Sequence, residues 1–365
     1  MSHPANSYAL VADIGGTNTR VALADGRRII ASTIRRYANA DFPGLESVLR
    51  RYIADEGGVD PVAACVAVAG PVRDGRATMT NLDWTIDKTT LARATKAETV
   101  AILNDLQAQG HALGHLDAAN IRTILPGPDT SAQAAKLVIG IGTGFNAAPV
   151  FDLPAGRIVT PSESGHANLP IRNEMELRLC QFVSTAHGFP AVEDVLSGRG
   201  LERVYAFLGN EDSDPREAAA QDIMAACADD SDPRAIAAAR LFTRILGTVC
   251  GNLSLIQLPF GGVYLVGGVA RAFAPHLTRF GFAEAFRDKG RLSSVLRQVP
   301  VYAVLDEQLG QRGAHYVAVR LLKQQQAPKK ELAAPLPAAR QVNLLLALAV
   351  GAVAGVAAAK YIGRR

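Results

Sequence analysis

Two glycine-rich turns have the composition of phosphate-binding loops, and the first of them follows an aspartate. An apolar run ends at Asp13, and the turn after it contains Gly15, Gly16, Thr17 and Asn18. In a tight glycine turn, backbone N–H groups can face a phosphate because no Cβ stands in the way. An aspartate at the preceding strand end can hold Mg²⁺, usually through water. The alternative for this segment is a glycine hairpin that binds nothing.

The second turn contains Gly142, Thr143 and Gly144, with the Thr143 hydroxyl as a side-chain donor. One such turn is a weak signal, because glycine-rich turns are common. Two of them, one in each half of the chain, would hold a triphosphate between them. The pair therefore predicts a nucleotide-binding site.

Asn104 and Asp105 directly follow an apolar strand pattern. The carboxyl end of a strand is where open α/β sheets place their ligands. There, Asp105 could accept the proton of a sugar hydroxyl while that oxygen attacks a phosphorus atom. Both residue types also favour the N-cap of a helix, so a purely structural role is the alternative.

Two further segments suit a sugar and a purine. Glu163 and His166 lie in one loop, and a carboxylate beside an imidazole suits the vicinal hydroxyls of a sugar. A strand pattern at 263–266 opens onto Gly267 and Gly268, which would permit the flat, close approach of a purine. A solvated loop and a simple strand-to-helix turn are the respective alternatives.

The elements that must position these residues fall into two α/β groups. The strand, glycine turn, strand arrangement occurs around both turns, which indicates an internal repeat at the level of the fold. Periodicity predicts strands at 8–13, 20–24, 63–69, 100–103, 137–141, 146–151 and 263–266, and helices at 42–54, 105–113, 174–183, 201–208, 215–228 and 233–255.

Composition favours a globular protein with two lobes. The chain has 365 residues, of which 48% are hydrophobic and 20% charged. Its net charge is only +4, and its basic residues are scattered among acids, so nucleic acid is not an expected partner. The four cysteines form no C-x-x-C pair, which argues against a zinc site or a redox dithiol. No signal peptide is expected at the N-terminus.

The C-terminal segment 342–359 is apolar except for Asn343 and is flanked by basic residues. As a helix it would rise about 27 Å, just enough for a hydrocarbon core of about 30 Å. Small residues recur at every fourth position, a stripe that lets membrane helices approach closely. We expect a membrane anchor at 342–362, joined by a linker at 324–341. A buried or disordered alanine-rich helix is the alternative.

Taken in order, the five chemical segments resemble the bacterial glucokinase family, in the branch of the actin-like superfamily that lacks the zinc motif of ROK proteins. The resemblance covers about residues 7–320. Further strings at 69–72, 80–84 and 196–201 agree with it: Ala-Gly-Pro-Val, Thr-Asn-Leu-Asp-Trp and Leu-Ser-Gly-Arg-Gly-Leu. The absence of a cysteine-rich loop and of an N-terminal helix-turn-helix argues against a ROK-type repressor.

The resemblance implies the reaction of ATP with glucose to give glucose 6-phosphate and ADP, with Asp105 as the catalytic base. It implies sugar binding by Asn104, Glu163 and His166. It assigns the remaining candidates to the first phosphate motif (Asp13, Gly15, Gly16, Thr17, Asn18), the second phosphate motif (Gly142, Thr143, Gly144) and the adenosine motif (Gly267, Gly268).

Three positions depart from the family pattern. A further sugar-binding glutamate, counted back from the Leu-Ser-Gly string, falls on Ala186, and the neighbouring His187 is the expected replacement. A missing hydrogen-bond partner of this kind costs about 1–3 kcal/mol. Asn146 stands where a glycine usually closes the second phosphate motif, and the string 310–314 differs from the usual Gly-Leu-x-Gly-Ala.

We therefore expect a two-lobe, RNase H-like fold of the actin-like ATPase and hexokinase type, with an interlobe cleft. The small lobe would be 1–109, completed by about 300–323, and the large lobe 110–299. The expected function is phosphorylation of glucose or a related hexose at the 6-hydroxyl, with ATP and Mg²⁺ as cofactors. Asp13 would hold the Mg²⁺, the lobes would lie on the cytoplasmic face of a membrane, and a homodimer is expected from the family and the small-residue stripe.

Two alternatives stay open. The chain could be a catalytically weakened or inactive sugar- or nucleotide-binding module tethered to a membrane, which the missing glutamate and the apolar tail favour. It could also be a kinase for another sugar, such as mannose or an amino sugar. The retained acidic and imidazole side chains favour an enzyme.

Overall fold

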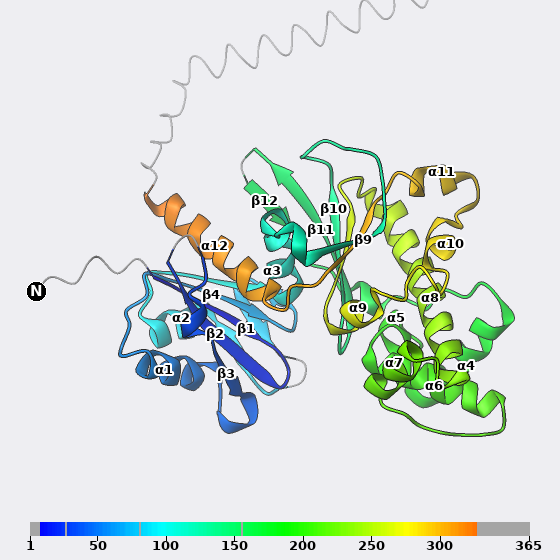
Figure 1. The fold of residues 1–365 in the computed structure, drawn as a ribbon. Coiled ribbons are helices and arrows are strands. Elements are labelled where there is room, and N and C mark those ends of the chain that lie inside the picture. The colour runs from blue at the N-terminus through cyan, green and yellow to red at the C-terminus, as the bar shows by residue number, and fades with distance from the viewer. Residues whose placement is uncertain (1–7, 26–27, 80–81, 155, 327–365) are drawn as a thin grey trace, which may run out of the picture. The chain divides into compact units, whose positions relative to one another are not determined.

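The structure, a computed structural model, describes residues 8–25, 28–79, 82–154 and 156–326. The described residues up to Leu322 form one compact unit. Two mixed β-sheets, each covered by helices, provide its framework (Figure 1).

The first sheet has the strand order β3-β2-β1-β4-β8. β1 pairs antiparallel with β2 and parallel with β4, and β8 adds parallel to β4. Every residue of β4 is buried, as expected for a strand covered on both faces. The bounds are Ala9–Ile14 (β1), Asn18–Ala24 (β2), Arg35–Ala38 (β3), Ala63–Val68 (β4) and Thr99–Asn104 (β8).

The second sheet has the order β12-β11-β10-β13-β14-β9 and repeats the connections of the first. Its antiparallel pair β10 and β11 encloses the second glycine turn, and β13 and β14 add in parallel beside β10. This confirms the predicted repeat. The bounds are Ile121–Leu125 (β9), Lys136–Ile141 (β10), Phe145–Leu153 (β11), Gly156–Val159 (β12), Val263–Val266 (β13) and Val301–Val304 (β14).

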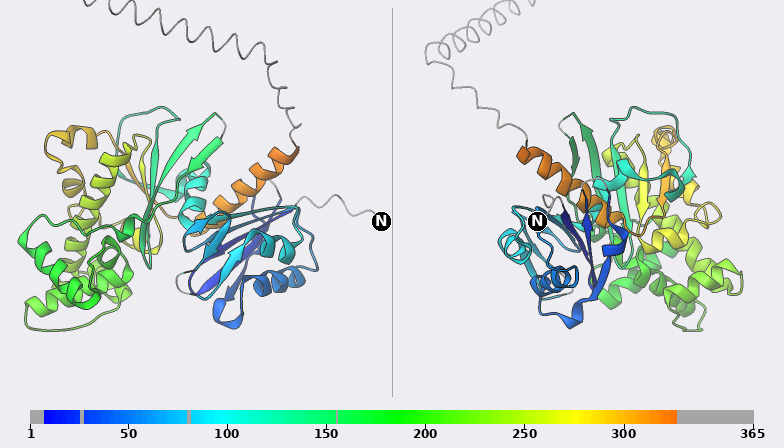
Figure 2. Two further views of the ribbon diagram at one scale, coloured as in Figure 1. Left: turned by 180° about the vertical axis from the view of Figure 1, so that it is seen from behind. Right: turned by 60° about the vertical axis from the view of Figure 1, so that its left-hand side comes forward.

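Helices cover both faces of the first sheet. α1 (Leu45–Asp55) and α2 (Lys88–Thr95) share one hydrophobic core with β1 and β4. On the other face, α12 (Leu309–Gln326) packs through Ala314 and Val317 (Figure 2). The last described helix therefore packs against strands from the start of the chain. A small sheet of β5 (Val72–Arg73), β6 (Arg76–Thr78) and β7 (Thr85–Asp87) lies between β4 and α2 in sequence.

One short helix links the two sheets. α3 (Asp105–Ala112) begins where β8 of the first sheet ends. Its residue Leu106 packs with Val138 of the second sheet, and the Gln107 amide donates to the carbonyl oxygen of Val159 at 3.0 Å. The start of α3 is therefore fixed relative to both sheets.

The remaining helices pack on the second sheet or on the 25-residue α8, which lies at their centre (Figure 1). α8 begins at a Pro after the N-cap Asp232, as is typical of helix starts. The bounds are Glu174–His187 (α4), Val192–Val195 (α5), Gly198–Glu211 (α6), Ala220–Ala228 (α7), Pro233–Gln257 (α8), Gly268–Phe273 (α9), Phe282–Arg287 (α10) and Ser293–Leu296 (α11).

The predicted helix 215–228 is shorter in the structure, where the stretch 214–219 is irregular and α7 follows it. Side chains hold this stretch in place. Arg234 donates to the carbonyl and carboxylate of Asp214, and the Ala220 N–H donates to Glu202. These bonds satisfy the local polar groups without a helix, so the helix begins late.

No helix within the described residues is both long and apolar enough to span a membrane. The predicted anchor at 342–362 lies outside the described residues, as does most of the predicted linker. Residues 324–326, at the start of that linker, belong to α12 instead.

Candidate active site

The first glycine turn joins β1 to β2 and is held by Asn39. The Gly15 N–H donates to the Asn18 carbonyl at 3.0 Å, which closes the turn. The Asn39 side-chain amide donates to the Gly15 carbonyl at 2.8 Å, and its backbone N–H donates to the Thr17 carbonyl at 2.9 Å. The Thr19 hydroxyl binds Asn39 Oδ1 at 2.7 Å. Asn39 is only 2% exposed, so it supports the turn from the interior.

The second glycine turn is closed in the same way and is supported by the Leu-Ser-Gly string. The Gly142 N–H donates to the Gly144 carbonyl at 2.9 Å, and the Gly198 N–H donates to the Gly142 carbonyl at 2.9 Å. Arg199 donates to the carbonyl of Thr143 at 3.4 Å. The Thr143 side chain is exposed.

Gly267 lies directly beside the second glycine turn. Its φ is +103°, and a Cβ there would approach the Ile141 carbonyl well inside 3.0 Å, which real Cβ atoms do not do. Only glycine fits both conditions. Because Ile141 precedes the turn, the predicted adenosine motif and second phosphate motif are neighbours, and exposed Gly268 begins α9 beside them.

At the end of β8, the helix-cap role that the sequence left open belongs to Asn104. Asn104 is the N-cap of α3: its Oδ1 accepts from the N–H groups of Leu106 and Gln107, at 3.0 and 3.4 Å. Its Nδ2 also donates to the Gly70 carbonyl at 3.1 Å. Asp105, the first residue of the helix, is not the N-cap, and its Oδ1 accepts from the Leu106 N–H at 2.8 Å.

Three carboxylates interact around this point. Burial raises the pKa of Asp105 from 3.8 to about 6, and the negative charges of Asp13 and Glu163 add to the shift. Burial also raises the pKa of Asp13, against the opposing effect of Arg20. The cluster brings together predicted residues from the first turn, the β8 end and the sugar loop. A carboxyl with a pKa near 6 is well suited to act as a general base at neutral pH.

Asn146, one of the three departures, anchors the loop that contains Glu163. Its Oδ1 accepts from the Ser164 N–H at 3.0 Å, and its Nδ2 donates to the Ser162 carbonyl. The same amide lies 3.5 Å from Glu163 Oε2. The asparagine therefore replaces a turn glycine with a side chain that fixes the loop to β11. Glu163 and His166 remain exposed.

Glu193, which was not among the predicted site residues, lies beside the second glycine turn. Its Oε2 accepts from the Phe145 N–H at 3.0 Å. A Cβ on Gly144 would collide with this carboxylate, and one on Gly165 would lie 3.4 Å from the Glu193 Cβ. Glu193 therefore lies between the second glycine turn and the sugar loop. An acid three residues before the Leu-Ser-Gly string was the available signal.

Ala186 and His187 lie elsewhere, at the C-terminal end of α4, where both are exposed. Within the described part of the chain, no hydrogen bond or ion pair joins His187 to the residues above. In the same part, no three His, Cys, Asp or Glu side chains gather closely enough to hold a metal ion by themselves.

The chain is similar in sequence and fold to several known proteins. The family model described as Glucokinase matches residues 10–321. A glucokinase of Saccharophagus degradans is 33% identical over 296 residues, covering 80% of this chain and 92% of the relative. A glucokinase structure from an Antarctic psychrotroph is 28% identical with a TM-score of 0.74, covering 86% of this chain and 99% of that one. Balamuthia mandrillaris glucokinase, solved with glucose, shares the fold with a TM-score of 0.73 at 24% identity, covering 86% of this chain and 93% of that one.

Proposed function

Because the chain belongs to the glucokinase family, we propose that it transfers the γ-phosphoryl group of ATP to the 6-hydroxyl of glucose, giving glucose 6-phosphate and ADP. It is a hexose kinase with a two-lobe actin-like fold. The observation that supports the proposal most directly is the position of Asp105, buried at the end of β8 and within electrostatic range of the carboxylates of Asp13 and Glu163.

In the proposed mechanism, Asp105 accepts the proton of the 6-hydroxyl as that oxygen attacks the γ-phosphorus. The new oxygen–phosphorus bond forms while the bond to the departing ADP oxygen breaks. Phosphoryl transfer needs mainly positioning and charge stabilisation from the protein. The hydrogen bond from the Leu106 N–H to Asp105 Oδ1, at 2.8 Å, fixes the direction of the carboxylate.

The two glycine turns would hold the phosphates of ATP through backbone N–H groups, and Gly267 and Gly268 would admit the adenosine. These residues also fit Mg²⁺, because Asp13 and Asp105 supply oxygen ligands. Burial disfavours the ionised form of both, and the charge of Asp13 adds to this effect at Asp105. Asp13 would hold the ion, through water. When bound, Mg²⁺ supplies charge neutralisation for the phosphates.

Glucose would be bound by Asn104, Glu163 and His166, and we place Glu193 rather than His187 beside them. The reason is position: Glu193 contacts both the second glycine turn and the sugar loop, whereas His187 is exposed at the end of α4.

Glu193→Gln should raise the KM for glucose about 10- to 100-fold, because a hydrogen bond to a charged acceptor is worth about 1.5–3 kcal/mol. The amide oxygen can still accept from the Phe145 N–H, so the fold should be kept. His187→Ala is the matched control and should leave KM unchanged. Initial rates at varied glucose concentrations measure both KM values. A raised KM in His187→Ala together with an unchanged KM in Glu193→Gln would assign the sugar contact to His187 instead.

The function itself is tested by coupled ADP release from the full chain with Mg-ATP and a panel of hexoses. We expect turnover that depends on glucose, with weaker turnover on mannose or glucosamine. A folded protein that binds ATP but phosphorylates no hexose would exclude the kinase and favour the inactive binding module. Preference for another hexose would change the substrate but not the reaction class.

We further propose that residues 342–362 anchor the kinase to the cytoplasmic face of a membrane, and that the chain forms a homodimer. The support is the apolar sequence and its small-residue stripe, in a segment beyond the family match at 10–321. Removing residues 341–365 should move the protein from the membrane pellet to the supernatant and lower its mass in light scattering. Equal fractionation with and without the segment would exclude the anchor.

A further inference from the structure

A groove along α8 lies outside the proposed active site. It consists of two cavities, of about 790 and 560 Å³, whose linings share Asn173, Glu176, Arg240 and Arg244. We call this pair the α8 groove. Either volume falls within the range of small-molecule sites, about 300–1,000 Å³. None of the residues assigned to ATP or glucose lines it.

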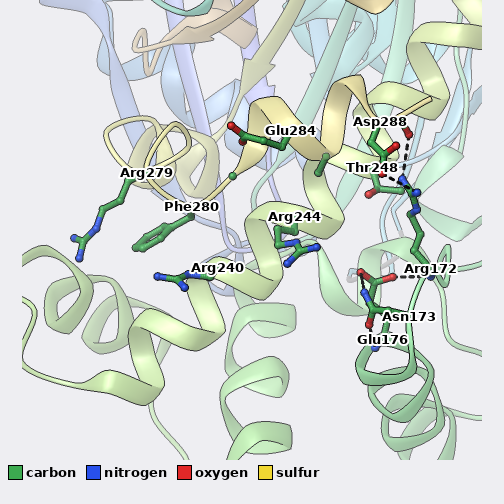
Figure 3. A pocket seen from close by; sticks show the side chains of 12 residues that line it. Arg172, Asn173, Glu176, Arg240, Arg244, Thr248, Arg279, Phe280, Glu284 and Asp288 are labelled. Carbon is green, nitrogen blue, oxygen red and sulfur yellow. Dashed lines mark hydrogen bonds and ion pairs between the residues drawn. The ribbon is translucent and has the colours of Figure 1, made fainter. Parts of the chain in front are cut away.

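Two arginines on one face of α8 supply the charge of the groove. Arg240 and Arg244 are four residues apart, so their side chains lie on the same side of the helix. Both are exposed, and within the described residues neither makes an ion pair or a side-chain hydrogen bond. Figure 3 shows both extending into the pocket, between Arg172 on one side and Phe280 on the other.

The other arginines of the groove already have carboxylate partners. Arg172 pairs with Asp288 at 2.8 Å, and Arg279 pairs with Asp230. Guanidinium groups bind oxyanions in a bidentate fork. Arg240 and Arg244 are therefore the groups of this lining that remain available to a ligand.

Within the described residues, the acids of the groove form no ion pair with these two arginines. Glu176 is only 4% exposed and already accepts from the Arg172 N–H at 2.7 Å and the Asn173 amide at 2.9 Å. Asp288 already forms an ion pair with Arg172. Glu284, on α10, makes no ion pair within the described residues. The carboxylates of Glu176 and Glu284 offset part of the charge of Arg240 and Arg244, so the attraction for an anion comes from the two free guanidinium forks and not from an excess of positive charge.

The smaller cavity adds an apolar wall next to the same two arginines. Its hydrophobic lining comes from α4, α6 and the first half of α8: Met175, Leu208, Pro233, Ile236, Ala237 and Leu241. A ligand that used both cavities would need an anionic group joined to an apolar body.

We propose that the α8 groove binds a small, soluble, amphiphilic organic phosphate. A phosphate monoester carries about 1.5–2 negative charges at neutral pH, which matches two unpaired guanidinium groups better than a single carboxylate does. Its phosphate lies between Arg240 and Arg244, and its apolar part packs against Ile236 and Leu241. Concave cavities of this size favour a discrete molecule over a flat membrane surface. Glucose 6-phosphate lacks the apolar body, so the site is separate from the kinase reaction.

Calorimetric titration of the full chain with hexyl phosphate tests the proposal, with Mg-ADP and glucose present at saturation to block the active site. We expect one saturable site, with inorganic phosphate and hexanol each binding at least about tenfold more weakly. No saturable binding of hexyl phosphate overturns the proposal. So does binding only to vesicles containing an anionic phospholipid, which would indicate a membrane surface.

Variants locate the site. Replacing Arg240 and Arg244 together by Gln should weaken hexyl phosphate about 100-fold, roughly tenfold for each charged hydrogen-bonding group. The matched control replaces Arg291 and Arg297 by Gln, two exposed arginines outside the groove. This control loses the same net charge but leaves the groove intact, so it should bind hexyl phosphate as tightly as the parent does. Equal affinity of the two double variants would exclude the site.

Ala237→Glu provides a second, independent variant, because Ala237 is exposed on α8 and lines the apolar cavity. The new carboxylate would pair with Arg240, three residues further on, and should weaken the binding of hexyl phosphate about tenfold. Glucose phosphorylation should be unchanged in all these variants. A failure of the groove would therefore be distinguishable from a failure of the proposed kinase activity.

Discussion

Asp105→Asn is expected to lower kcat by a factor of about 10²–10⁴ and, at the same time, to stabilise the fold at pH 8. The asparagine can still accept the Leu106 N–H bond, so the start of α3 should be preserved. It cannot accept the proton of the sugar hydroxyl. Coupled ADP release measures the first effect, and urea unfolding measures the second.

The sign of the stability effect follows from the raised pKa. The pKa of Asp105 rises from 3.8 to about 6 on folding, so the folded state holds the proton of this carboxyl more tightly. Below about pH 4 the group is protonated in both states and contributes nothing. Stability is lost as the pH rises from about 4 to about 6, and the full loss remains above that. Removing the charge should therefore recover about 1–3 kcal/mol at pH 8, and less at pH 5.

Two observations would contradict this reading of Asp105. Retained turnover in Asp105→Asn would remove it as the base, and a fold less stable than the parent at pH 8 would contradict its unfavourable burial. Asp60→Asn is a suitable control, because Asp60 is exposed and should change neither quantity. In the parent enzyme, kcat/KM should fall as the pH drops through about 6.

The sheet framework could be predicted because its signals are local. The strands around each glycine turn are short apolar runs, and the repeat of strand, turn and strand is visible without any long-range information. Asp105 could be predicted because it directly follows such a run. Its role could not be separated from that of a helix cap until the structure assigned the cap to Asn104.

The supports of the site could not be predicted, because their partners are distant in sequence. Asn39 holds Gly15 from 24 residues away, and Asn146 holds Ser164 from 18 residues away. No periodicity or spacing links such pairs. Glu193 was missed for another reason: a count along the chain pointed to Ala186, while the short helix α5 places the carboxylate beside Phe145.

The string at the start of α12 shows how a departure from a family pattern can leave the essential contacts intact. Gln311 replaces the usual leucine and is only 1% exposed, and its amide has no hydrogen-bond partner within the described residues. The two glycines of the string, Gly310 and Gly313, are retained. Gly310 faces the Asp13 carboxylate, and Gly313 faces the backbone of α3.

Gly313→Ala is expected to lower the free energy of unfolding by about 3 kcal/mol, at the upper end of the overpacking range. A Cβ at this position would lie well inside 3.0 Å of the Ala108 carbonyl, so α3 and α12 would have to separate. At a helix position with free space, the same substitution would instead raise the free energy of unfolding by about 1 kcal/mol. The sign of the change therefore tests whether Gly313 contacts Ala108. The midpoint of urea unfolding measures it.

Gly310→Ala is the matched comparison on the same helix. Its Cβ would lie 3.1 Å from an Asp13 carboxylate oxygen, so it meets a side chain of the active site rather than a backbone. We expect it to raise the KM for Mg-ATP while changing stability by less than about 1 kcal/mol. If Gly313→Ala unfolds at the same or a higher urea concentration than the parent, α12 does not cross α3 at Ala108. The fixed position of the Asp105 carboxylate would then need another explanation, because α3 carries it.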